Sequence, residues 1–170
     1  MQYQISYYSP KGRGKTLVDA LCQLLPKDTI ISNLAEAPKP AGDVQLVVFD
    51  FTRTNLKCIP TCVAEYLHKL EGKVIALFAT VPFVPNYPEK QFLHDHLLAF
   101  LPRACDFRGL FLCGAEPTEA LVRNLRLLIS HRPEHTEAKH WLDRCEKAKG
   151  RPDNRDVQKA CQFMQHVLEL

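Results

Sequence analysis

The sequence predicts an α/β fold in which helices cover both faces of a parallel β-sheet. Short runs rich in β-branched and aromatic residues alternate with segments whose apolar residues recur at helical spacing. The central runs, QLVVFDF, KVIALFAT and GLFLC, are almost continuously apolar, which is typical of strands buried on both faces. Five strands are predicted, at residues 3–8, 29–33, 44–50, 73–80 and 108–113.

Helices are predicted between and after these strands. An apolar stripe over residues 17–25 indicates the first helix, and Pro26 ends it. A second stripe over residues 121–129 follows Pro117 and Thr118, residues typical of a helix start, and we expect it to cover the last strand. Further helices are predicted at residues 58–70, 90–101 and 157–168.

The length of 170 residues fits one domain with one core. We expect a single domain over residues 1–170, with the sheet core at residues 1–130 and a C-terminal helical extension at residues 131–170. The extension is predicted because the composition after Ser130 is rich in charge and poor in β-branched residues. Trp141 is expected to fasten this extension to the sheet.

Composition narrows the possible partners and the compartment. The net charge of +3 is too small to indicate nucleic-acid binding. No apolar run reaches the roughly 18 residues of a membrane span, so no membrane association is expected. The seven cysteines lie mostly in apolar stretches, as reduced thiols do, which indicates a cytoplasmic protein. The histidine and cysteine spacings predict no metal site.

The loop SPKGRGKT at residues 9–16 follows the first strand and enters a helix. Backbone N–H groups at a helix start lack intrahelical acceptors and can bind a phosphate. Glycines allow close approach, and the hydroxyl and basic side chains add donors and charge. The alternative is a tight turn with a solvated basic face.

A nucleoside triphosphatase is a second interpretation of the same loop. Gly14-Lys15-Thr16 matches the end of a Walker A loop, but Ser9 stands where the leading glycine is required. Asp50, after the third strand, is the candidate carboxylate for magnesium. The mismatch at Ser9 makes this interpretation the weaker one.

Three segments in the same order resemble the flavodoxin family, in particular its short flavodoxin-like proteins. The first is the loop after Tyr8-Ser9, which resembles the S/T-x-T-G-x-T phosphate loop. The others are FLCGAEP at residues 111–117 and GRPDNRDVQKACQF at residues 150–163. The resemblance implies a three-layer sandwich with strand order 2-1-3-4-5 and FMN as a non-covalent cofactor.

The resemblance also implies which residues bind FMN. Lys11 and Gly14 stand where the family usually has threonine. The phosphate would lie on Ser9, Lys11, Gly12, Arg13, Gly14 and Lys15. The ring would lie between two loops at the carboxyl ends of strands three and four, with walls made by Phe51, Thr52, Arg53, Thr54, Thr80, Val81, Phe83 and Tyr87.

By resemblance, the function would be electron transfer and not catalysis on a substrate of its own, because FMN carries the electrons. The partner would be a reductase or another flavin or metal enzyme, and the positive net charge favours an acidic docking face on it. The alternative is a flavin-free interaction module. In that case Lys11, Arg13 and Lys15 would recognise an anionic partner or another phosphate ligand.

Overall fold

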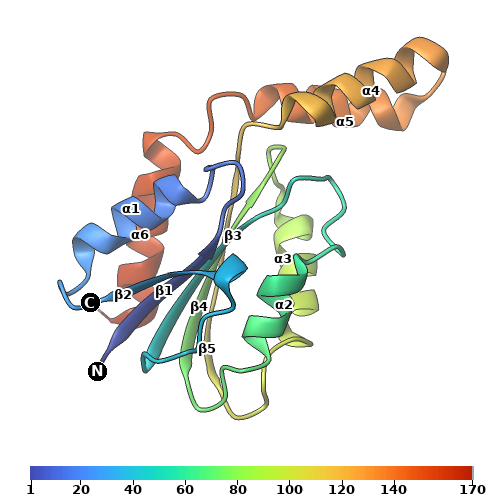
Figure 1. Cartoon of the computed structure of the whole chain (residues 1–170). Helices are drawn as coiled ribbons and strands as arrows, with labels where there is room; N and C mark the ends of the chain where they lie inside the picture. The colour runs from blue at the N-terminus through green and yellow to red at the C-terminus, as the bar shows by residue number, and fades with distance from the viewer. Residues whose placement is uncertain (170) are drawn as a thin grey trace.

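The computed structural model describes residues 1–169 and contains a five-stranded, fully parallel sheet (Figure 1). The strands lie in the order β2-β1-β3-β4-β5, which confirms the predicted topology. Only the ends of several strands differ from the predicted ranges. The strands are β1 (Tyr3–Tyr8), β2 (Ile30–Asn33), β3 (Val44–Asp50), β4 (Val74–Val81) and β5 (Asp106–Gly114).

Helices cover both faces of the sheet. One face carries α1 (Lys15–Leu24) and α6 (Asn154–Leu168), and the other carries α2 (Thr61–Leu67), α3 (Tyr87–Leu98) and the 3-10 turn η1 (Leu34–Glu36). Val48 and Phe49, neighbours in β3, are both fully buried, one in each apolar core. Successive strand residues point to opposite faces, so the apolar run of β3 reflects burial on both sides.

Two predicted helices begin elsewhere. The helix expected from residue 58 begins after Pro60, which precedes it in an extended conformation. The helix expected from residue 90 begins at Tyr87, where Asn86 and Glu89 form a capping box. No helix in residues 1–169 has the length and apolar character needed to cross a membrane.

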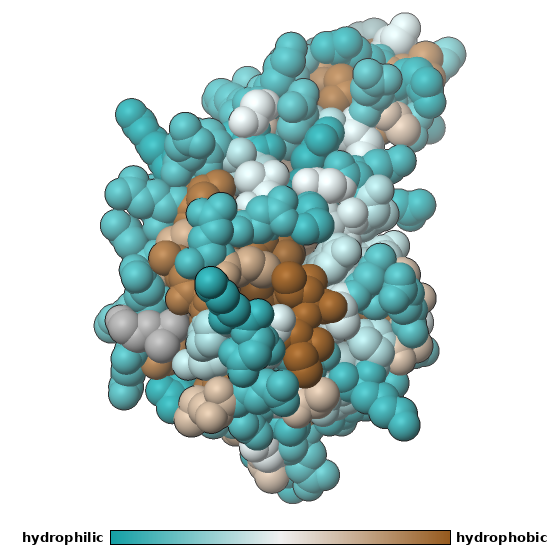
Figure 2. Space-filling model, turned by 60° about the vertical axis from the view of Figure 1, so that its left-hand side comes forward, coloured by the Kyte–Doolittle hydropathy of each residue, from teal (hydrophilic) through white to brown (hydrophobic). Residues whose placement is uncertain are grey.

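An α-helical hairpin, α4 (Glu119–His131) and α5 (Thr136–Lys147), projects beyond the carboxyl ends of the strands (Figure 1, upper right). The prediction that the stripe at residues 121–129 covers the last strand is therefore wrong, since α4 has no buried residue and packs against α5. Instead α6 covers β5, with Phe163 against Phe78 and Phe111. Figure 2 shows apolar residues gathered over the body, whereas the upper part is mainly hydrophilic.

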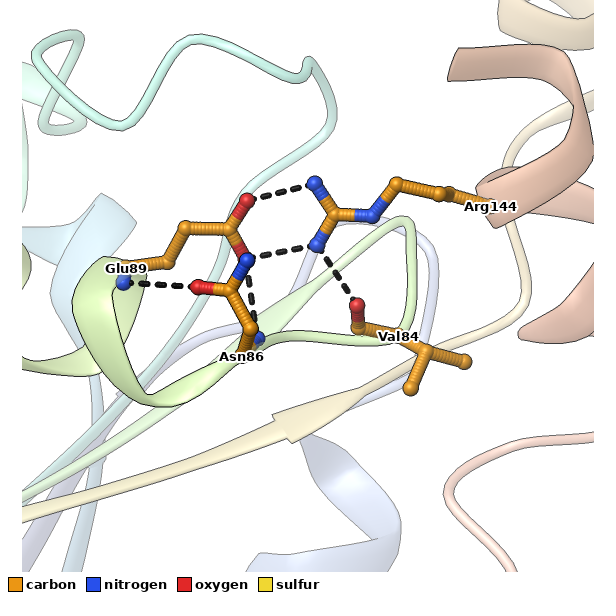
Figure 3. Close-up of polar contacts among 4 residues, drawn as sticks. All are labelled: Val84, Asn86, Glu89 and Arg144. Carbon is orange, nitrogen blue, oxygen red and sulfur yellow. Dashed lines mark hydrogen bonds and ion pairs between the residues drawn. The ribbon is translucent and has the colours of Figure 1, made fainter. Parts of the chain in front are cut away.

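Two side chains of α5 fasten the hairpin to the loop between β4 and α3. The ring of Trp141 contacts that of Phe83, with centroids 5.0 Å apart, which confirms the expected role of Trp141. The guanidinium of Arg144 lies over both rings, at 4.7 Å and 4.9 Å. Arg144 also donates to both carboxylate oxygens of Glu89, at 2.5 Å and 2.6 Å, and to the Val84 carbonyl at 2.7 Å (Figure 3). The position of the hairpin therefore depends on Arg144.

Replacing Arg144 by alanine is expected to lower the free energy of unfolding by about 3 kcal/mol, because it leaves the Glu89 carboxylate partly buried without its partner. Lys147→Ala is the matched control, since Lys147 pairs with Asp143 on the same helix but both are exposed. It should cost about 0.5 kcal/mol or less. Urea unfolding followed by circular dichroism measures both. A loss for Arg144→Ala no larger than that for Lys147→Ala would contradict the assignment.

The same ion pair predicts a pH dependence. Burial acts to raise the pKa of Glu89, but hydrogen bonds from Arg144 and the Asn86 amide, with the charge of Arg144, hold this pKa below its ordinary value. Its stabilising contribution is therefore complete above the unfolded pKa of about 4.3 and is lost as the pH falls through the folded pKa. The difference in unfolding free energy between wild type and Glu89→Gln should shrink below about pH 4. A constant difference from pH 7 to pH 3 would contradict it.

Candidate functional site

A cavity of about 970 Å³ lies where three segments meet: the β1–α1 loop, the β3–α2 loop and the start of α4. The first two segments follow the strands on either side of the point where the strand order reverses, which is where open α/β sheets bind ligands. The volume is at the upper end of the range for small-molecule sites, about 300–1,000 Å³. The lining residues are Pro10, Lys11, Arg13, Thr52, Arg53, Thr54, Asn55, Thr118, Glu119, Ala120, Leu121 and Asn124.

Three cationic side chains, Lys11, Arg13 and Arg53, line this cavity. Within residues 1–169 none of them has a carboxylate at ion-pair distance. The guanidinium of Arg13 is oriented by a 3.0 Å hydrogen bond from its Nε to the carbonyl of Glu116. Lys11 lies in the same β1–α1 loop as Arg13, whereas Arg53 lies in the β3–α2 loop, and both Lys11 and Arg53 are exposed. Together with the hydroxyls of neighbouring threonines, these groups can bind a phosphoryl or carboxylate group.

Lys15, the remaining predicted cation, does not line the cavity. Its Nζ pairs with Asp19 one turn along α1, at 2.5 Å, and lies 5.6 Å from the centroid of the Tyr7 ring. Glycines 12 and 14 do not line it either, although they shape the loop. Gly12 has a φ of 77°, which favours glycine, and its amide donates to the Ser9 carbonyl at 3.1 Å.

The inner side of the loop is filled by Asp50, the last residue of β3. Its side chain is 3% exposed and accepts hydrogen bonds from Ser9 Oγ at 2.6 Å, from Thr80 Oγ1 at 2.8 Å and from the Gly14 amide. Ser9 Oγ in turn accepts from the Lys15 amide at 3.2 Å. Burial raises the pKa of Asp50, and these hydrogen bonds only partly oppose it. The loop therefore already holds a carboxylate.

The predicted ring-stacking residues lie away from the cavity. Phe83 is fully buried beneath Trp141, and Phe51 is 6% exposed with its centroid 5.6 Å from that of Phe49. Tyr87 is 74% exposed at the start of α3, while Thr80 and Val81 are buried within β4. Phe51 does line a separate, smaller cavity of about 230 Å³ behind the β3–α2 loop. Among residues 1–169, no aromatic side chain lines the larger cavity.

The residues present therefore do not fit FMN in the position that the resemblance implies. Ser9 Oγ and the amides of Gly12, Gly14 and Lys15 already donate to or accept from protein groups. A phosphate inside the loop would also meet the Asp50 carboxylate. Two unit charges about 4 Å apart repel by about 4 kcal/mol at an effective dielectric constant of about 20. The larger cavity offers charge for a phosphate but no stacking surface for a flavin ring.

Sequence reasoning missed the contribution of α4, since it placed this helix over the sheet. Thr118 caps α4 by accepting from the Leu121 amide at 3.2 Å, and Thr118, Glu119 and Asn124 all line the cavity. The sequence indicates the role of Asp50 only weakly, by the position of an acidic residue at the end of a buried strand. Asp50 is the carboxylate that a triphosphatase would need for magnesium, but the structure directs it to Ser9, Gly14 and Thr80.

Comparisons with known proteins agree with the fold. Three solved flavodoxin structures resemble this chain at low sequence identity. A short-chain flavodoxin associated with a non-canonical PDU bacterial microcompartment is 11% identical, with a TM-score of 0.59, and 99% of this chain and 97% of that chain are covered. Oxidised flavodoxin 2 from Bacillus cereus is 13% identical, with a TM-score of 0.52 and 99% of each chain covered. A flavodoxin from the domain Archaea is 10% identical, with a TM-score of 0.50, 99% of this chain and 97% of that chain being covered.

At these identities the structural similarity shows the fold alone. A search of curated proteins found no match. A model of the flavodoxin domain, however, matches residues 4–165, which is nearly the whole chain. The chain therefore belongs to the flavodoxin domain family.

Proposed function

We propose that this chain is a flavin-free member of its family and binds a phosphorylated small molecule in the cavity between the β1–α1 loop, the β3–α2 loop and α4. The observation that carries the proposal is the gathering of Lys11, Arg13 and Arg53 around one large cavity, with no carboxylate of residues 1–169 at ion-pair distance from them. The loop beside it is filled by its own carboxylate.

The lining assigns different tasks to different residues. Arg13, oriented by the Glu116 carbonyl, presents its remaining guanidinium donors in a fixed direction, which suits a phosphate oxygen. Arg53 and Lys11 are exposed and add attraction that salt weakens. Asn124 and Glu119, from α4, offer hydrogen-bond acceptors to an uncharged part of the ligand, such as a hydroxyl group.

Electron transfer with FMN is the second candidate function, and membership of the flavodoxin domain family favours it. In that case Lys11, Arg13 and Arg53 would hold the phosphate outside the loop, in the larger cavity. FMN would supply the electron chemistry when bound. The chain would then serve a redox enzyme, a reductase or a flavin or metal enzyme, and its net charge of +3 favours an acidic docking face on that enzyme.

The proposed phosphate site is tested with pyrophosphate as the probe, by isothermal titration calorimetry. Arg53→Gln should weaken pyrophosphate binding about 10-fold or more, since a hydrogen bond from a charged group contributes about 1.5–3 kcal/mol. Lys69→Gln, an exposed lysine after α2, is the control and should leave the affinity unchanged. Equal affinity in the two variants, or no binding to the wild type, overturns the proposal.

A fluorescence titration of FMN with the purified chain separates the two candidate functions. The flavin-free proposal predicts a colourless protein that leaves FMN fluorescence unquenched at micromolar concentrations. The physical reason is that Asp50 fills the loop and no aromatic ring lines the larger cavity. Quenching together with a bound-flavin absorption spectrum would instead establish the second candidate and reject the first.

A further inference from the structure

Asp50 and Gly14 are matched to one another. A side chain at Gly14 would place its Cβ 2.5 Å from Asp50 Oδ1, closer than any real contact of this kind. The φ of Gly14 is −69°, an ordinary helical value, so its backbone conformation does not require glycine. The close approach of the carboxylate does. Gly14 is therefore needed because Asp50 occupies the space above it.

The Asp50 carboxylate also performs the task that a bound anion performs at such a loop. Orphan amides at a helix start need an acceptor. Asp50 accepts directly from the Gly14 amide, and it accepts from Ser9 Oγ, which receives the Lys15 amide. Thr80 completes the set of donors from β4. These donors of Ser9, Gly14, Lys15 and Thr80 are thus satisfied by the protein itself.

We infer that Asp50 is a built-in anion that determines the ligand specificity of the loop: it replaces a phosphate and excludes one. The inference rests on the proposed function in one respect only, the location of the ligand. The ligand lies in the larger cavity, of about 970 Å³, which we call the outer cavity, and not inside the loop. Removing the carboxylate frees the hydroxyl of Ser9 and the amide of Gly14, which otherwise donate to it. The loop then becomes a phosphate site, although the wild-type chain has none there.

The test compares Asp50→Ser with the wild type in the full chain, with inorganic phosphate and then FMN as probes. Calorimetry should show that Asp50→Ser binds inorganic phosphate at least about 100-fold more tightly than the wild type does, because a repelling charge is removed and the space of the carboxylate is opened. The affinity for FMN, measured by fluorescence quenching, should likewise be higher in Asp50→Ser than in the wild type. Asp43→Ser is the matched control, since it removes the same charge from the other end of β3. It should show no gain.

Asp50→Asn separates charge from space. It keeps the size of the side chain, so its phosphate affinity should rise by less than a tenth of the increase found for Asp50→Ser. If Asp50→Ser does not fold, Asp50→Asn is measured in its place. A higher phosphate affinity in Asp50→Asn than in Asp43→Ser then supports the inference. Unchanged phosphate affinity in the folded Asp50 variants overturns it.

A double variant distinguishes this inference from the proposed function. The gain in Asp50→Ser should persist when Arg53→Gln is added, because the freed donors come from Ser9 and Gly14, which do not line the larger cavity. If Arg53→Gln abolishes the gain, the new phosphate lies in the outer cavity and the inference fails. The wild-type titration with pyrophosphate judges the proposed function independently.

Discussion

The buried carboxylate of Asp50 is the interaction on which the site depends. It connects the ends of three adjacent strands, since Ser9 follows β1, Asp50 ends β3 and Thr80 lies in β4. Charged groups are rarely buried without compensation, and here neutral hydrogen-bond donors provide most of it, with a smaller contribution from the charge of Arg13. Such donors are fixed by the backbone and by short side chains. The hydrogen bonds of Asp50 therefore fix the position of the loop relative to β3 and β4.

The α4–α5 hairpin also contributes to the site at the carboxyl ends of the strands. Arg144 and Trp141 bind the β4–α3 loop, which buries Phe83 and fixes the direction in which the hairpin projects. Because α4 is paired with α5, this anchoring also positions the residues of α4 that line the cavity. The hairpin thus supplies a wall of the site, although its contacts with the sheet are few.

The strands were predictable because β3 and β4 are buried on both faces, which leaves continuous apolar runs in the sequence. Their order was predictable only through the resemblance to the flavodoxin family. The loop at residues 9–16 was predictable for a similar reason, since its glycines and basic residues are contiguous. The filling of that loop was not, because Ser9 and Asp50 are 41 residues apart. The burial of Phe83 depends likewise on a helix far along the chain. A stripe such as that of α4 predicts a helix but not the surface it packs against.

The hydrogen-bond donors of the β1–α1 loop are satisfied by Asp50 and Ser9, so they do not need a bound ligand as acceptor. The two apolar cores lie on either side of the sheet. A helix start with unsatisfied amides would be stabilised by ligand binding, since any ligand that binds only the folded state adds to its stability. In this chain Asp50 provides that stabilisation permanently, at the cost of burying a charge. Under the proposed function, ligand binding would be separated from folding, because the exposed residues Lys11 and Arg53 line the larger cavity while Asp50 holds the loop.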